Sequence, residues 1–273
     1  MTDKVIHGFK GFGKSMKCRD FQYEEGKEYT TDKAKACEFG FHACEYPLDV
    51  FSYYAPADSV YHETEQSGEL DKNSDDSKVA STKIKIGARI DVKGIIKASF
   101  DYIKERCTNE EQGKDKSALN GGHCSALNGG DCSALNGGDC SALNGGHCSA
   151  LNGGDRSALN GGDWSALNGG YCSALNGGNK SALNGGDRSA LNGGYCSALN
   201  GGNWSKLTGG KFSVVYGCGH GAQVRGDIGS VLALAELDDD YSLIKVHVKG
   251  VDGKKIKANT FYELKNGKFC EVK

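Results

Sequence analysis

Proline and long apolar runs are both scarce in this chain. Only 2 of its 273 residues are proline, which excludes a proline-rich linker protein. No run of apolar residues approaches the length needed to cross a bilayer, and the N-terminal segment MTDKVIHGFKGFGK lacks an apolar signal core. We therefore expect a cytoplasmic protein with no membrane partner.

A large excess of charge of one sign is also missing. The formal net charge is −2, so there is no basic field to attract nucleic acid or an anionic membrane. We therefore do not expect a nucleic-acid partner. The chain has 12 cysteines, which in a small secreted protein would predict disulfides. Without an export signal we interpret them as reduced thiols.

Glycine is abundant, with 41 residues, and it is periodic. The six letters SALNGG occur eleven times between Ser117 and Gly202, as part of an octapeptide S-A-L-N-G-G-x-x. A degraded copy and two looser copies follow. This pattern divides the chain into residues 1–112 with globular composition, 113–228 with the repeats, and 229–273 with strand-like patterning.

The octapeptide predicts a β-solenoid. Asn-Gly followed by a second Gly is a strong turn signal, and the rest of the octapeptide is long enough for one short strand. A helix is disfavoured because each interior glycine costs about 1 kcal/mol. Side-chain alternation points Ser and Leu inward, and Ala and the eighth position outward. We expect the Asn residues to stack as a ladder at a corner.

The two variable letters repeat every third copy, which predicts a three-sided coil made of three octapeptides. The alternative is a two-sided coil of two octapeptides, in which the longer period records only how the repeats were duplicated. For the three-sided coil, strand spacing predicts a prism about 20–25 Å long. The three-sided coil would stack exposed columns that could bind a partner, namely His123, His147, Tyr171 and Tyr195; Cys124, Cys148, Cys172 and Cys196; and Asp139, Asp163 and Asp187.

The columns leave several chemistries open. The cysteines with the neighbouring histidines could form a soft-metal or redox stripe, or simply a column that tolerates a small residue. The aspartates could bind calcium, although the repeat lacks the glycine pattern of the calcium-binding β-roll. We commit to no metal and no cofactor.

Outside the repeats the patterns predict a small α+β domain and a C-terminal β cap. The cap would cover the open strand edges that a solenoid exposes. The expected strands are Val60–Leu70, Lys83–Ile90, Val231–Leu237 and Leu243–Val251, and a hairpin turns at Asn266-Gly267. The expected helices begin near Pro47 and span Val92–Cys107.

The segments FKGFGKSMKCRDFQYEEGKEY, CEFGFHACEYPLDVFSYY and DDSKVASTKIKIG resemble an uncharacterised domain found in phage and prophage proteins. Proteins of that family often have octapeptide arrays after this domain and a C-terminal piece similar to VKGVDGKKIKANTFYELKNGKFCEV. The resemblance implies a phage-associated protein, which would then be located in the cytoplasm of the bacterial host, but no known activity. This array differs from the family's usual S-A-A-x-x-S-G-x, so its core packing is expected to differ.

Two weaker candidate sites fall in the same domain. The fragment EFGFH followed by Tyr53-Tyr54 is loosely similar to part of the ADP-ribosyltransferase fold, which would imply His7, Tyr53 and Glu65 as catalytic candidates. Separately, four side chains could bind zinc, namely Cys18, Cys37, His42 and Cys44, although their spacing lacks the usual close Cys pairs. They are also explained as buried, packed side chains.

The sequence therefore favours a non-enzymatic binding or structural protein. In this hypothesis a rigid solenoid presents columns of exposed side chains to a protein partner, and association with further copies of the chain is left open. The alternative is a nucleotide-binding or ADP-ribosyltransferase-like N-terminal enzyme, with the solenoid as a spacer.

Overall fold

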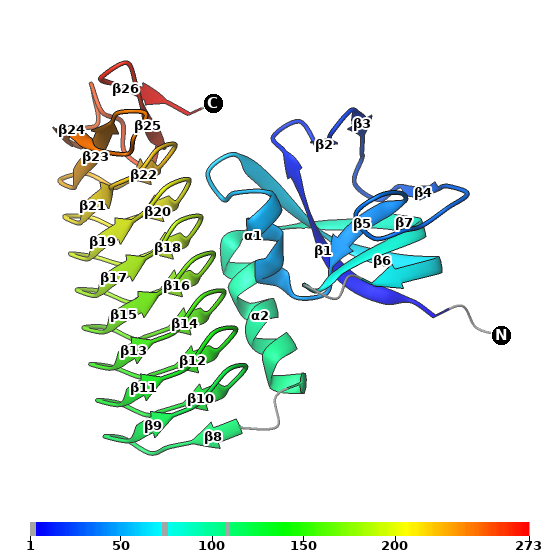
Figure 1. The fold of residues 1–273 in the computed structure, drawn as a ribbon. Coiled ribbons are helices and arrows are strands. Elements are labelled where there is room, and N and C mark those ends of the chain that lie inside the picture. The colour runs from blue at the N-terminus through cyan, green and yellow to red at the C-terminus, as the bar shows by residue number, and fades with distance from the viewer. Residues whose placement is uncertain (1–3, 73–75, 107–109, 273) are drawn as a thin grey trace. The chain divides into compact units, whose positions relative to one another are not determined.

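The computed structural model describes residues 4–72, 76–106 and 110–272. It divides into two compact units, Met1–Tyr102 and Ile103–Lys273 (Figure 1). Among the described residues, no helix is both long and apolar enough to span a membrane.

The first unit is a small sheet domain with two helical segments. Its strands are β1 (Ile6–Gly13), β2 (Lys17–Cys18), β3 (Phe21–Gln22), β4 (Glu28–Thr30), β5 (Phe41–Cys44), β6 (Ser59–Lys72) and β7 (Lys78–Ile90). The helical segments are η1 (Pro47–Asp49) continuing into α1 (Val50–Tyr53), and α2 (Val92–Arg106), whose residues from Ile103 on are counted with the second unit. The sheet order is β4-β7-β5-β1-β6, and β7 also pairs with β6, so four strands close into a ring.

The interior of this ring is filled by alternate residues of the strands. Phe12, Ile84 and Ile86 are fully buried and pack in one cluster. Gln66 is also fully buried, and its amide donates to the carbonyl oxygens of Phe41 and Val79, each at 2.9 Å. This one side chain thus ties β6 to both β5 and β7.

The strands and helices expected in this domain are present, and one long strand was missed. The turn into the helix at Pro47 is confirmed, and α2 begins at Val92 as predicted. Cys107, the expected last residue of that helix, lies outside the described residues. The missed strand is β1, whose glycines resemble a loop. A Cβ at Gly8 would lie 2.9 Å from the Cys44 carbonyl oxygen, so the glycine permits the close approach of β5.

The repeats form a β-solenoid, as predicted, built from two parallel sheets. One sheet contains β8 (Glu110–Gln112), β10 (Ala126–Asn128), β12 (Ala142–Asn144), β14 (Ala158–Asn160), β16 (Ala174–Asn176), β18 (Ala190–Asn192), β20 (Lys206–Thr208) and β22 (Gln223–Arg225). The other contains β9 (Ala118–Asn120), β11 (Ala134–Asn136), β13 (Ala150–Asn152), β15 (Ala166–Gly169), β17 (Ala182–Gly185), β19 (Ala198–Gly201), β21 (Val214–Gly217) and β23 (Val231–Leu237).

The expected three-sided coil of three octapeptides is wrong. Ala126 pairs with Ala142, and Ala134 pairs with Ala150, so each coil consists of two octapeptides and has two sides. The constant letters form the strands and are the same in every octapeptide, so they fit either register. The variable pair lies at the corners and does not set the number of sides. About seven turns give a length of about 34 Å at the usual strand spacing, longer than expected.

The inward direction of the constant Ser and Leu is confirmed, whereas the exposure expected for Ala holds on only one of the two sheets. From Ser125 and Leu127 on, the repeat serines and leucines are buried, and Leu127 through Leu207 form one continuous core between the two sheets. Ala150 and its equivalents on the second sheet are exposed. On the first sheet the expected exposure is wrong, because Ala126, Ala142, Ala158, Ala174 and Ala190 are buried. The predicted asparagine ladder is also present: the Asn152 amide donates to the Asn136 side-chain oxygen at 2.9 Å, one coil apart.

The corner itself differs from the expected Asn-Gly turn. None of the SALNGG glycines has a positive φ; instead every eighth-position residue does, for example Cys124 (54°) and Trp164 (62°). The glycines are needed for space. A Cβ at Gly145 would lie 2.7 Å from Ser149 Cβ, and one at Gly146 would lie 2.3 Å from Asp131 Oδ1 in the coil before it.

The C-terminal segment adds antiparallel strands to both sheets of the solenoid, which agrees with the β cap predicted for it. Strand β24 (Leu243–Gly250) pairs with β23, and the hairpin of β25 (Tyr262–Lys265) and β26 (Lys268–Glu271) pairs with β22. Asn266 and Gly267 form the hairpin turn with positive φ values of 49° and 68°, which confirms the predicted turn.

Candidate ligand pocket in the first unit

The first unit contains a pocket of about 800 Å³, within the range typical of small-molecule sites. Its walls come from β1, β5, the turn between β2 and β3, and the end of α1. The lining is rich in aromatic side chains, among them Phe9, Phe21, Tyr23, Phe41, Tyr53 and Tyr54. The pocket therefore offers flat apolar surfaces with a few polar groups between them.

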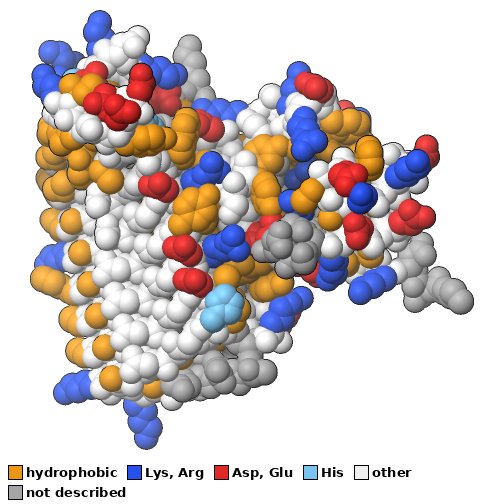
Figure 2. All heavy atoms as spheres, viewed as in Figure 1, with side chains coloured by type: hydrophobic (Ala, Val, Ile, Leu, Met, Phe, Trp, Pro, Cys, Tyr) orange, Lys and Arg blue, Asp and Glu red, His pale blue; other side chains and the backbone are white. Residues whose placement is uncertain are grey.

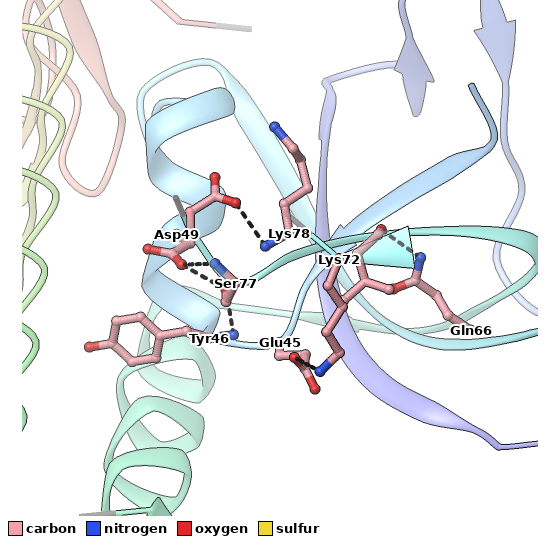
Figure 3. A network of polar contacts seen from close by, with 9 residues as sticks. Glu45, Tyr46, Asp49, Gln66, Lys72, Ser77 and Lys78 are labelled. Atoms are coloured by element: carbon pink, nitrogen blue, oxygen red, sulfur yellow. Dashed lines mark hydrogen bonds and ion pairs between the residues drawn. The ribbon is translucent and has the colours of Figure 1, made fainter. Parts of the chain in front are cut away.

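A polar network holds the helical segment that supplies one wall (Figure 3). Asp49 Oδ2 accepts hydrogen bonds from the Ser77 hydroxyl at 2.6 Å and the Ser77 backbone N–H at 3.1 Å. The Ser77 hydroxyl accepts in turn from the Tyr46 N–H at 2.9 Å. An ion pair of 2.6 Å joins Glu45 to Lys72 nearby. These contacts tie η1 to the start of β7. They thereby place Tyr53 and Tyr54, which follow η1 at the end of α1, on the wall of the pocket.

Glycine lets the helical segment approach the sheet closely. A Cβ at Gly11 would lie 2.5 Å from Tyr54 Cβ and 2.7 Å from the first carbon of its ring. Both residues line the pocket. The glycine in β1 therefore leaves the room in which Tyr54 packs against this wall.

Lys10 is the most unusual group of the pocket, because it is a lysine with only 6% of its surface exposed. Its ammonium donates to the His42 carbonyl oxygen at 2.8 Å and lies 3.6 Å from Cys18 Sγ. It also lies 5.5 and 5.4 Å from the ring centres of Phe12 and Tyr23. Burial lowers the pKa of Lys10, and the neighbouring Cys18 opposes this shift. The pocket therefore has a buried cationic group at its wall.

The other titratable groups are shifted mainly by burial. Burial lowers the pKa of His42, and the Lys10 charge adds to this effect. His42 Nε2 accepts a hydrogen bond from the Cys37 N–H at 3.1 Å. Burial raises the pKa of the Cys44 thiol, with a further increase from Asp49. Burial and a hydrogen bond to Asp76 raise the pKa of Tyr53 to about 12.

The four zinc candidates all line this one pocket, but they do not form a cluster of ligands. Within the described part of the chain, the only group of three or more His, Cys, Asp or Glu side chains close enough to hold a metal lies elsewhere, in the solenoid. Cys18 is next to Lys10, His42 already accepts a backbone hydrogen bond, and Cys44 is buried. Their common location thus defines a pocket wall and not a metal centre.

The three transferase candidates are not brought together. His7 and Glu65 are cross-strand partners on β1 and β6 and line a second pocket of about 270 Å³. Glu65 lies 3.5 Å from Lys85 there. Tyr53 lines the larger pocket, where its hydroxyl contacts Asp76 and is 2.9 Å from Lys78 Nζ. A common site for these three residues is therefore not formed.

The predicted solenoid columns are rearranged by the coil of two octapeptides, and Cys172, which was expected to be exposed, is buried. Their members alternate between two corners, which we name after the first histidine of each. The His123 corner has Cys124, Cys140, Arg156, Cys172, Arg188 and Trp204 at the eighth position, and His123, Asp139, Asp155, Tyr171, Asp187 and Asn203 before them. The His147 corner has Cys132, Cys148, Trp164, Lys180, Cys196 and Phe212, and Asp131, His147, Asp163, Asn179, Tyr195 and Lys211 before them.

The aspartates at these corners have a structural contact. Asp131 Oδ1 accepts the His147 backbone N–H at 2.7 Å, and Asp155 Oδ1 accepts that of Tyr171 at 2.8 Å. Each carboxylate thus bonds the next coil, which explains why Asp and Asn are frequent here. A role of these columns in binding stays a prediction.

Sequence reasoning missed Lys10, Arg19 and Tyr54 as pocket residues. The segment FKGF places a lysine among apolar residues of a strand, and this was the available signal for Lys10. Arg19 follows a very short strand in a tight turn, where pattern gives no indication of a pocket. Chemically, the pocket lining combines aromatic faces with three cations, Lys10, Arg19 and Lys78. It also includes the acidic Asp20 and Glu38.

No curated protein and no solved structure matches this chain. A family model matches its N-terminal part, which agrees with the expected resemblance to an uncharacterised domain. Residues 6–98, which include every residue that lines the pocket, match the family described as Domain of unknown function (DUF7666).

Proposed function

We propose that this chain is a non-enzymatic binding protein whose first unit holds a nucleotide-like ligand, an aromatic ring with an anionic group. The observation that supports this is the pocket of about 800 Å³, in which aromatic side chains surround the cationic Lys10, Arg19 and Lys78. Flat rings stack on aromatic faces, and cations bind phosphate or carboxylate groups. A catalytic role is not favoured, because the candidate transferase residues lie in two different pockets.

The solenoid is in this proposal a rigid support that contacts a protein partner. Apolar side chains gather on its C-terminal end (Figure 2). Val214, Val231 and Val248 are exposed by 51%, 37% and 56%, and they belong to the neighbouring strands β21, β23 and β24. A contiguous apolar patch of this kind is typical of a protein-binding surface. The phage-associated origin and the cytoplasmic location implied by the sequence belong to the same proposal.

Ligand binding is tested on the full chain by thermal shift and calorimetry with AMP, ADP, ATP and NAD, and with adenosine as the uncharged comparison. We expect the anionic nucleotides to raise the melting temperature and adenosine to bind at least tenfold more weakly. Arg19→Gln, which changes an exposed pocket cation, should weaken nucleotide binding. Lys27→Met, which changes an exposed lysine paired with Glu24 outside the pocket, should not. Binding to none of these nucleotides, or equal binding by the Arg19 variant, would contradict the proposal.

A further inference from the structure

Adjacent thiols occur at only two places along the described solenoid corners. Cys140 follows Cys124 at the His123 corner, and Cys148 follows Cys132 at the His147 corner. The remaining repeat cysteines have other neighbours in their columns. Cys172 lies between Arg156 and Arg188, and Cys196 lies between Lys180 and Phe212. The two pairs therefore arise from the two-sided coil, which brings together cysteines that the sequence separates.

The pair at the His123 corner has a third ligand beside it. The ligand atoms of His123, Cys124 and Cys140 all lie within 4.8 Å of one another. The backbone holds this arrangement, because the Cys124 N–H donates to the Asp139 carbonyl oxygen of the next coil at 2.9 Å. Cys124 and Cys140 have nearly the same φ, 54° and 55°, so their side chains leave the corner in the same way.

Two thiolates and one imidazole are soft ligands that select a d¹⁰ cation. Metal–sulfur and metal–nitrogen bonds of about 2.3 and 2.0 Å place ligand atoms about 3.5–4.0 Å apart, so side chains now within 4.8 Å need only small rotations. Three ligands suit a trigonal ion, whereas structural zinc takes four.

We propose that His123, Cys124 and Cys140 form a binding site for Cu(I). Both thiols lose their protons to solvent when the ion binds, and the imidazole binds in its neutral form. The second pair, Cys132 and Cys148, lies at the other corner, where no third ligand is within the same distance among the described residues. It therefore serves as an internal comparison with two thiols and no histidine ligand atom within 4.8 Å, although His147 precedes Cys148 in the chain.

The site is tested by anaerobic titration of the reduced full chain with Cu(I), in competition with a chromophoric Cu(I) chelator. A Cys132→Ser/Cys148→Ser background removes the second pair. We expect this background to take one equivalent of Cu(I) from the chelator, and Cys140→Ser to abolish that uptake. His123→Ala should weaken binding at least tenfold. Cys196→Ser, which removes an exposed thiol with no cysteine neighbour, should change nothing.

Two results would overturn the assignment. One is that no Cu(I) is taken from the chelator, or that the Cys140 variant binds as much as the background. The other is that Zn(II), titrated in the same background, displaces Cu(I), because the three-ligand geometry was the reason for choosing Cu(I). Circular dichroism of each variant confirms that the solenoid is intact. Since Cys140 does not belong to the leucine core, its replacement by serine is expected to leave the fold unchanged.

Discussion

At the scale of single residues, burial decides which ionisable groups are unusual in this protein. Lys10 and His42 belong to different strands but share one pocket wall, and the Lys10 ammonium bonds the His42 carbonyl oxygen. Burial disfavours the charged form of both groups and lowers the pKa of both. A site with groups of this kind is a candidate for binding, and the same groups make its stability depend on pH.

His42 gives the first prediction at this scale. Its pKa in the folded chain lies below the ordinary 6.5, so the unfolded chain takes up the proton first as the pH falls. The stability that neutral His42 contributes is therefore present above the unfolded pKa and is lost as the pH falls toward the folded pKa. We expect an NMR titration to give a midpoint below 6.5 for the His42 imidazole.

In the variant His42→Gln the NMR signal of the His42 imidazole is lost, which assigns that signal. The glutamine keeps a side-chain oxygen that can accept the Cys37 N–H. The unfolding free energy of the wild type minus that of this variant should be smaller at about pH 5 than at about pH 7.5. A midpoint at or above the ordinary value, or a difference that does not change with pH, would show that burial does not control this histidine.

Residue patterns predicted the interior of the solenoid but not the pocket. Ser and Leu repeat without change, and strand alternation fixes their direction, so their burial followed directly. Lys10 could not be found in this way. A lysine is ordinarily exposed, and its burial here depends on Tyr23 and other side chains that pack around it from distant parts of the chain.

At the scale of the element, the octapeptide is one strand and one corner, and the corner is where sequence reasoning was least accurate. Asn-Gly suggested positive φ at the glycines, whereas the left-handed residue is the eighth one, such as Cys140 or Arg156. Sequence could not separate these cases, because glycine is needed both for left-handed backbone and for close packing. Here a Cβ at Gly145 would meet Ser149 and Leu151 of the next octapeptide, and one at Gly146 would meet Asp131 of the coil before it.

Gly145 tests this explanation. In Gly145→Ala the added methyl group would lie 2.7 Å from Ser149 Cβ and 2.8 Å from Leu151 Cδ1, although the backbone conformation suits alanine. We expect the variant to lose about 1–3 kcal/mol of unfolding free energy, the usual cost of overpacking. Urea unfolding followed by circular dichroism measures the change.

The matched control is Ala150→Ser, a little further along the chain and exposed on the outer face of the second sheet. It should shift the unfolding free energy by less than about 0.5 kcal/mol. If Gly145→Ala were as stable as this control, the glycines would have to be explained by something other than space.

At the scale of the whole molecule, the number of sides was the feature that sequence could not determine. Identical strands in every octapeptide are compatible with two or three octapeptides per coil, and the variable pair favoured three. The structure pairs Ala142 with Ala126 and Ala158, which fixes two. The choice depends on how two leucine faces fill the space between sheets, and no single residue records it. The consequence is functional, because it brings Cys124 beside Cys140.

The cap leaves β24 as the outermost strand of its sheet among the described strands. Ile244, Val246 and Val248 are exposed on one face by 62%, 38% and 56%. Exposed apolar edge strands pair readily with other chains, and lysine is the side chain that most often prevents this. Lys245 and Lys249 are exposed on the same strand, so two copies of β24 paired edge to edge would bring like charges together.

We therefore expect Lys245→Thr/Lys249→Thr to self-associate. Threonine keeps the strand propensity while the charges are removed, so the edge becomes open to pairing. Sedimentation velocity should show larger species for this variant at concentrations where the wild type does not form them, and high salt should move the wild type in the same direction by screening the lysines. The control Lys254→Thr/Lys255→Thr removes the same charge from the exposed loop after β24 and should sediment like the wild type. Equal behaviour of the two double variants would mean that net charge, and not the edge of β24, keeps copies of this protein apart.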